Sequence, residues 1–313
     1  MIIRLGYVAI SKSIKESTST PYSYTTWVQE KDQEKLEKII ISNLEALYQT
    51  LIYNDKNHIH FYRISSNIIP LATHPNVSFD YLEKFLPYYK KITSILQKSK
   101  IRVDFHPNQY CVLNSVKKEV ITSAINILEY HYQLLKILNI QDKIILLHIG
   151  SNAFGKTNSL SRFIHTFENL PNHLKEIIAI ENDDKVFNIE DCLFLAKKLN
   201  IPVVLDYHHH QCNPTSKELF TYLNDIFFTW KRKGMTPKIH FSSPKNKREY
   251  RAHNDYIDTN SFIQFLNILK QKNQDVDIML ETKAKDDALF RLVRELKYHE
   301  NYLFLDETSF KIE

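Results

Sequence analysis

The chain has 313 residues, of which 43% are hydrophobic and 25% are charged, and its formal net charge at pH 7 is +5. This composition is typical of an ordinary globular protein and excludes a disordered or fibrous chain. Only four glycines occur, which excludes the glycine-rich phosphate loops of Rossmann and P-loop proteins. No stretch approaches the roughly 20 apolar residues of a membrane span, so we expect no membrane partner.

The first apolar run, residues 2–10, is short and interrupted by Arg4, so we do not interpret it as a signal peptide. The three cysteines, Cys111, Cys192 and Cys212, form no CxxC pair and suit a reducing compartment. Together these observations predict a cytoplasmic protein.

Eight short runs rich in Ile, Val and Leu recur along the chain, and each is followed by apolar residues at helical spacing. The runs cover residues 2–10, 60–65, 101–106, 143–149, 176–181, 201–207, 237–241 and 276–281. Strands that alternate with helices predict a parallel sheet. Eight units of about 39 residues fit a (β/α)8 barrel, whereas a doubly wound open sheet lacks its usual glycine-rich first turn here. We predict an α/β fold with one TIM-barrel domain over residues 1–313.

Histidines and carboxylates recur at or just beyond the ends of these predicted strands. They are His106, His148, Glu181, Asp206, His209, His240, His253 and Glu281. In a barrel these positions meet at the C-terminal face, where catalytic groups of this fold gather. Imidazole mixed with carboxylate suits Mn²⁺, Zn²⁺ or Fe²⁺, and there are more ligands than one ion can use. Any one of these histidines alone fits an ordinary core or loop role, but so many ionisable groups together would be costly without a metal. We predict two or three divalent ions, a kind of site that commonly hydrolyses phosphate esters.

Lys238 lies two residues before His240, so both side chains point to the same face of the strand. A cationic lysine facing metal ions would be repelled. Lys238 therefore either neutralises a phosphate or carries a carboxylated amine, and a salt bridge at the rim is the remaining alternative. His74 lies in the loop after the second predicted strand.

An amide and an aromatic residue, Gln109 and Tyr110, follow His106 directly on a loop beside the predicted metals. An aromatic side chain there can wedge into a base stack and hold a gap open. An ordinary loop aromatic is an equal alternative, because the chain has 18 tyrosines. Tyr7, late in the first strand, lines the same mouth or belongs to the core. Two basic runs, residues 231–233 and 245–251, would suit a phosphate backbone.

Together these residues resemble the UV damage endonucleases over nearly the whole chain. The matching segments are Leu5-Gly6-Tyr7, Tyr62-Arg63-Ile64-Ser65-Ser66, Phe105-His106-Pro107-Asn108-Gln109-Tyr110, His148, Glu181-Asn182, Asp206-Tyr207-His208-His209-His210, Lys238-Ile239-His240, Arg251-Ala252-His253 and Leu280-Glu281-Thr282-Lys283. The barrel and its metals are shared with the related endonuclease IV. The resemblance implies a first ion on His106, His148 and Glu181. A second ion is implied on Glu181, Asp206, His240 and Glu281, and a third on His209, His253 and a carboxylated Lys238.

The resemblance further implies Mn²⁺ as the metal, with Zn²⁺ or other ions as alternatives. It implies a catalytic set of Glu181, Lys238 and His74, the last touching either metal or phosphate. Gln109 and Tyr110 would fill the gap left by flipped bases, and Tyr7 would contact the DNA. One departure is Ser11, which stands where the resemblance leads us to expect an asparagine.

The implied reaction is hydrolysis of double-stranded DNA immediately 5′ to a cyclobutane pyrimidine dimer or (6-4) photoproduct. We expect a monomer that acts on DNA at the nucleoid. The nearest rival is an AP endonuclease of the endonuclease IV type, against which Gln109, Tyr110 and Lys238 argue. A metal-dependent sugar isomerase would rely more on carboxylates, and a non-catalytic damage-binding protein would lack some of the ligands.

Overall fold

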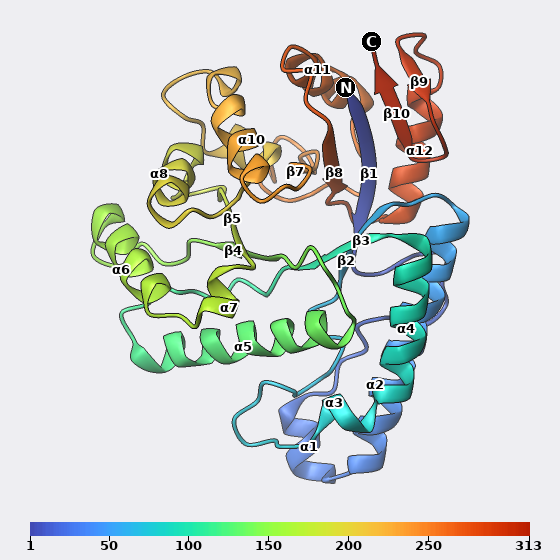
Figure 1. The fold of residues 1–313 in the computed structure, drawn as a ribbon, viewed down its shortest axis with the longest axis vertical. Coiled ribbons are helices and arrows are strands. Elements are labelled where there is room, and N and C mark those ends of the chain that lie inside the picture. Colours follow the sequence, from blue (N-terminus) through green and yellow to red (C-terminus); the bar gives the residue numbers. More distant parts are fainter.

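The structure, a computed structural model, describes residues 1–313 as one closed barrel of eight parallel strands surrounded by helices (Figure 1). The strands are β1 (Ile2–Val8), β2 (Phe61–Ile64), β3 (Arg102–Phe105), β4 (Ile145–His148), β5 (Ile178–Glu181), β6 (Val203–Asp206), β7 (Lys238–Phe241) and β8 (Val276–Leu280). Each strand pairs with its successor, and β1 pairs with both β8 and β2 to close the ring. The predicted TIM barrel is confirmed, and each of the eight predicted runs contains a strand.

Helices fill the crossovers between successive strands. They are α1 (Tyr24–Glu30), α2 (Gln33–Lys56), α3 (Tyr81–Lys84), α4 (Leu86–Ser99), α5 (Lys118–Ile137), α6 (Lys156–Glu168), α7 (Asn172–Lys175), α8 (Ile189–Leu199), α9 (Tyr207–Cys212), the 3₁₀ helix η1 (Leu219–Thr221), α10 (Leu223–Lys231), α11 (Thr259–Lys270) and α12 (Asp286–Leu296). Strands and helices contribute to one continuous apolar cluster. None of the helices combines the length and the apolar composition that a membrane crossing requires.

Side chains alternate between the two faces of each barrel strand, so one set of positions points into the barrel. On the β4–β6 side the interior is apolar, and Ile144, Leu146, Ala179 and Val204 form a small separate cluster there. The opposite side is charged. Its inward side chains include Arg4, Arg63, Arg102, Asp104, Lys238 and Asp277. Asp277 is fully buried and accepts hydrogen bonds from Arg4 at 2.6 Å and from Arg102 at 2.7 Å. The predicted ligands stand above this charged layer.

A hairpin of β9 (Tyr302–Phe304) and β10 (Ser309–Ile312) was not predicted, because its short segments show neither clear alternation nor a following helix. β10 runs antiparallel to the first residues of β1, while β2 pairs with the last residues of β1. Both chain ends therefore lie at the same end of the molecule (Figure 1). Gly6 allows the close approach of β1 and β2, since a Cβ there would collide with the carbonyl oxygen of Phe61.

Candidate active site

The predicted metal ligands lie at the C-terminal ends of six different barrel strands. His106 and Glu281 directly follow β3 and β8, His148, Glu181 and Asp206 end β4, β5 and β6, and His240 is the third residue of β7. All six positions share the parity of the inward-facing side chains on their strands. The barrel therefore brings six groups that are far apart in the sequence to one mouth.

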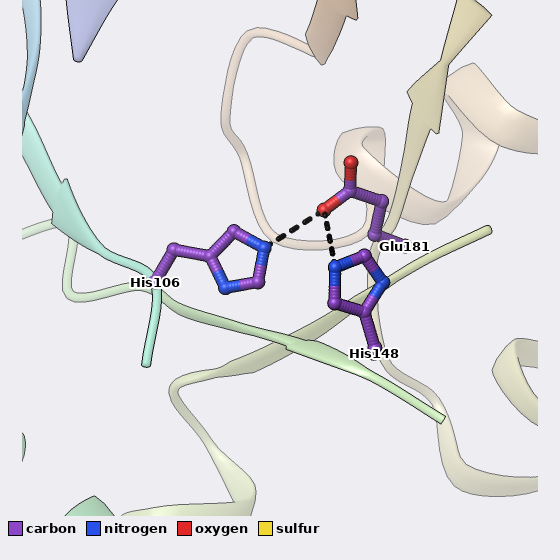
Figure 2. Close-up of side chains that lie close together, drawn as sticks. All are labelled: His106, His148 and Glu181. Carbon is purple, nitrogen blue, oxygen red and sulfur yellow. Dashed lines mark hydrogen bonds and ion pairs between the residues drawn. The ribbon is translucent and has the colours of Figure 1, made fainter. Parts of the chain in front are cut away.

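Glu181 is the centre of this cluster, and it is 1% exposed. Its Oε2 lies 3.0 Å from Nε2 of His106 and 3.9 Å from Nε2 of His148, so one oxygen faces both rings (Figure 2). Its Oε1 lies 2.7 Å from Nδ1 of His240. Burial opposes ionisation of Glu181, but His240 and His148 outweigh it and hold the pKa of the carboxyl well below its usual value. Glu181 is therefore an anion that several ligand groups share.

Three sets of side chains place their ligand atoms within 4.8 Å of one another, and Glu181 belongs to all of them. They are His106 with His148 and Glu181, Glu181 with His240 and Glu281, and Glu181 with Asp206 and His209. Mixed imidazole and carboxylate donors of this kind suit Mn²⁺, Fe²⁺ or Zn²⁺. These residues could hold divalent ions.

Asp206 supports that fit independently. It is fully buried, and its Oδ2 has no hydrogen-bond partner, although it lies 3.6 Å from Nδ1 of His209. Burial, reinforced by Glu181 and Glu281, raises the pKa of Asp206 well above its usual value. A buried carboxylate oxygen without a partner is costly, and a bound cation would satisfy it.

The structure brings Asp206 and His209 into one set of neighbouring ligand atoms, whereas the resemblance implies that these two residues bind different ions. We expected Asp206 beside His240 and Glu281, and His209 beside His253 and Lys238. Instead, Asp206 caps helix α9 by accepting a hydrogen bond from the backbone N–H of His209 at 2.7 Å. This cap places the two side chains together, three residues apart in the sequence, because helix α9 starts directly after β6.

His253 borders the cluster, with Nδ1 4.0 Å from Oε2 of Glu281. Lys238 does not join His209 and His253. Its side chain is completely buried and is paired with Asp104, and its Nζ lies 5.2 Å from the centre of the Phe61 ring. Burial lowers the pKa of Lys238 to about 8. The structure thus places Lys238 in the charged layer beneath the ligands.

Two further predicted residues lie away from the cluster. His74 stacks on Tyr24, with ring centres 3.8 Å apart, and belongs to none of the three ligand sets. Tyr7 is fully buried, and its hydroxyl donates a hydrogen bond to Asn54 of helix α2 at 2.8 Å. The prediction that Tyr7 contacts DNA is not supported, because its strand position points toward the helices, and the core alternative describes it correctly.

Gln109 and Tyr110 lie on the exposed loop that follows β3, and Tyr110 is 74% exposed. Both border a cavity of about 760 Å³ that also reaches His148, His209 and the loop of residues 183–186. The loop is shaped by Asn108, whose side chain accepts a hydrogen bond from the backbone N–H of Tyr110 at 3.0 Å. An exposed aromatic ring therefore stands beside a cavity that opens on two candidate ligands.

Sequence reasoning missed two partners of the ligands. Arg63 donates a hydrogen bond to Glu281 at 2.6 Å, and its Nη2 lies 2.6 Å from Nε2 of His240. Asn182 exchanges two hydrogen bonds of 2.9 Å with the backbone of Asp206. A charged residue inside an apolar strand was the available signal for Arg63.

The two basic runs separate in space. Residues 231–233 end α10 and begin its connection to β7 at the N-terminal end of the barrel, opposite the mouth. There the ammonium of Lys233 donates a hydrogen bond to the carbonyl of Glu176 at 3.0 Å. Residues 245–251 follow β7 on the mouth side and are exposed. Only the second run can contact DNA at the candidate active site.

A family model described as UV-endonuclease UvdE matches residues 3–307. The chain belongs to the UvdE family of UV endonucleases. A UV DNA damage endonuclease of Bacillus mycoides (strain KBAB4) is 40% identical to it over 301 residues, 95% of each chain. The crystal structure of SacUVDE is similar at 35% identity with a TM-score of 0.87, over 95% of this chain and 98% of that one.

A more distant match outside the UvdE family shows the fold alone. Endonuclease IV from Thermus thermophilus is 12% identical with a TM-score of 0.53, over 88% of this chain and 91% of that one. The resemblance to UV damage endonucleases and the shared barrel of endonuclease IV are therefore both confirmed.

Proposed function

We propose that this UvdE-family protein cuts double-stranded DNA immediately 5′ to UV photolesions, both cyclobutane pyrimidine dimers and (6-4) photoproducts. The observation that carries the proposal is Glu181, a buried anion shared by three ligand sets beside a cavity bordered by Tyr110. Family membership supports DNA as the substrate. We further propose a monomer that acts on DNA at the nucleoid in the cytoplasm.

Up to three divalent ions would be held by the ligand sets around Glu181, with His253 at their edge. We propose Mn²⁺, with Zn²⁺ as the alternative, because both accept mixed imidazole and carboxylate donors. Such ions supply electrostatic stabilisation to phosphodiester hydrolysis and make water a better nucleophile.

Carboxylation of Lys238 and contact of His74 with a phosphate stay predictions. A mass increase of one CO₂ on intact wild-type protein that is absent from Lys238→Met would support carboxylation of Lys238.

The side chains of the protein position both the ligands and the DNA. Arg63 fixes Glu281, and Asn182 fixes the backbone of Asp206, so neither carboxylate has to reorganise when a phosphate arrives. Tyr110 would fill the gap in a base stack from which the lesion has been extruded. The cavity of about 760 Å³ beside it is roomy enough to receive bases.

Strand nicking tests the proposal directly. A labelled duplex with one thymine dimer is incubated with Mn²⁺ or with EDTA, beside undamaged and abasic duplexes. We expect a Mn²⁺-dependent cut immediately 5′ to the dimer and no cut in undamaged DNA. Cutting of the abasic duplex alone would favour the AP endonuclease alternative. No cutting of any duplex would reject both, and aldose–ketose exchange would then be assayed.

A further inference from the structure

The loops that follow β1 and β8 are joined at the mouth by one buried carboxylate. Asp286, the first residue of α12, is fully buried. It accepts hydrogen bonds from Oγ of Ser11 at 2.8 Å and from the backbone N–H groups of Lys12 at 2.6 Å and Ser13 at 3.2 Å. Ser11 therefore points inward, and the loop after β1 is held against the loop after β8. The two loops form one continuous segment of the rim.

Lys285, next to Asp286, has an unusual backbone conformation, with φ 56° and ψ −124°. Residues with a Cβ rarely adopt such a conformation, which costs free energy and is retained mainly where function requires it. Glycine would adopt it without strain. The strained backbone therefore marks Lys285 as a position to test for a function.

The ammonium of Lys285 has no hydrogen bond or ion pair within the chain, although the side chain is half-buried. It follows the candidate ligand Glu281 by four residues in the loop after β8, and its neighbour Asp286 binds the backbone of Lys12, so Lys285 lies on the rim of the mouth. Glu281 already accepts a hydrogen bond from Arg63 at 2.6 Å and does not need a second cation. Lys285 is thus a partly desolvated cation at the edge of the site, without an internal partner.

We propose that Lys285, with Lys12 beside it, binds a phosphate of the DNA backbone on the β8–β1 side of the active site. This inference rests on the proposed function. In the closed barrel the β8–β1 side lies across the mouth from the β3–β5 loops that border the lesion cavity. The cut strand would then cross the mouth above the ligands, with its bases near Tyr110 and a flanking phosphate on Lys285. A lysine ammonium is a compact cation that suits a phosphodiester oxygen.

The salt dependence of nicking measures this contact. Each neutralised phosphate releases counterions and adds about 0.9 to the slope of log affinity against log salt concentration. We therefore measure kcat/KM on the dimer duplex over a range of salt for wild type and for Lys285→Gln. Lys233→Gln, which changes a half-buried lysine at the opposite end of the barrel, is the matched control. We expect the slope to fall by about 0.9 in Lys285→Gln only, with unchanged metal content.

Two more variants separate phosphate binding from a structural role. Lys285→Arg should show the same salt slope as wild type, because it keeps the positive charge. In Lys285→Gly the salt slope should fall as it does in Lys285→Gln. The melting temperature should nevertheless rise, because glycine removes the backbone strain. A slope in Lys285→Gln equal to that of wild type would overturn the inference, as would a loss of bound metal in that variant. If wild type cuts no dimer duplex, the proposed function fails, and the salt slope for binding of undamaged duplex still tests the lysine.

Discussion

The guanidinium of Arg63 donates a hydrogen bond to Glu281 over 2.6 Å, so a buried cation directly contacts a carboxylate of the candidate metal site. Burial opposes ionisation of Glu281, and Arg63 is the main group that lowers its pKa nonetheless. In the metal-free protein, Arg63 therefore stabilises the ionised carboxylate of Glu281, as a bound cation would also do in part. Removing Arg63 should therefore make the stability of the folded protein more dependent on bound metal.

We expect Arg63→Met to lower the free energy of unfolding of the metal-free protein by about 3 kcal/mol, because it leaves buried carboxylates without their partner. Added Mn²⁺ should restore more stability in this variant than in wild type. Urea unfolding with and without Mn²⁺ measures both effects. Arg291→Met, which breaks an exposed pair with Glu295, should change neither quantity. Equal effects of the two substitutions would contradict this interpretation.

Glu181→Gln should remove the anion that all three ligand sets share, while keeping the shape of the side chain. We expect fewer bound divalent ions per chain and a loss of nicking on the order of a thousandfold or more. Elemental analysis and the nicking assay measure the two effects. Glu129→Gln, at a half-buried carboxylate paired with His173, is the control. Full metal content in Glu181→Gln would show that Glu181 is not a ligand.

Tyr110→Ala should reduce discrimination between damaged and undamaged duplex by roughly 10- to 100-fold, because stacking of one base on an aromatic ring is worth about 1–3 kcal/mol. Competition binding with the two duplexes measures this ratio. Tyr298→Ala serves as the control, since Tyr298 is 89% exposed at the opposite end of the barrel. An unchanged ratio in Tyr110→Ala would leave this residue as an ordinary loop aromatic.

His131 should make the protein sensitive to acid. It is buried in helix α5 against Phe105, and burial lowers its pKa to about 4. Since the unfolded value is about 6.5, protonation favours the unfolded chain. The contribution to stability is complete above pH 6.5 and is lost as the pH falls toward 4, by about 1.4 kcal/mol for each unit.

His131→Phe should therefore lose less stability than wild type between pH 7 and about pH 5. Urea unfolding at the two pH values measures the difference. His165→Phe, at an exposed position of helix α6, should behave as wild type does. If His131→Phe and wild type lose the same stability, the acid sensitivity lies elsewhere.

The barrel and most of the candidate metal ligands could be predicted, because the C-terminal ends of the strands converge in a barrel regardless of the conformation of the loops. His106, His148 and Glu181 follow from that rule alone. The sequence could not decide whether Tyr7 points into the barrel or toward the helices, because alternation along β1 does not show which face is inward. That choice becomes clear only when Gly6 is known to occupy an inward position. The ion pair of Lys238 could not be predicted, because its partner, Asp104, lies on a strand far away in the sequence.

The hairpin of β9 and β10 brings the C-terminal strand against the first residues of β1, where the backbone N–H of Ile312 donates to the carbonyl of Met1 at 2.9 Å. Both ends are therefore on the face of the barrel opposite the mouth. A tether or fluorescent label attached to either end would leave the approach of a duplex unobstructed. Immobilised enzyme could then be watched nicking single DNA molecules without loss of access to the site.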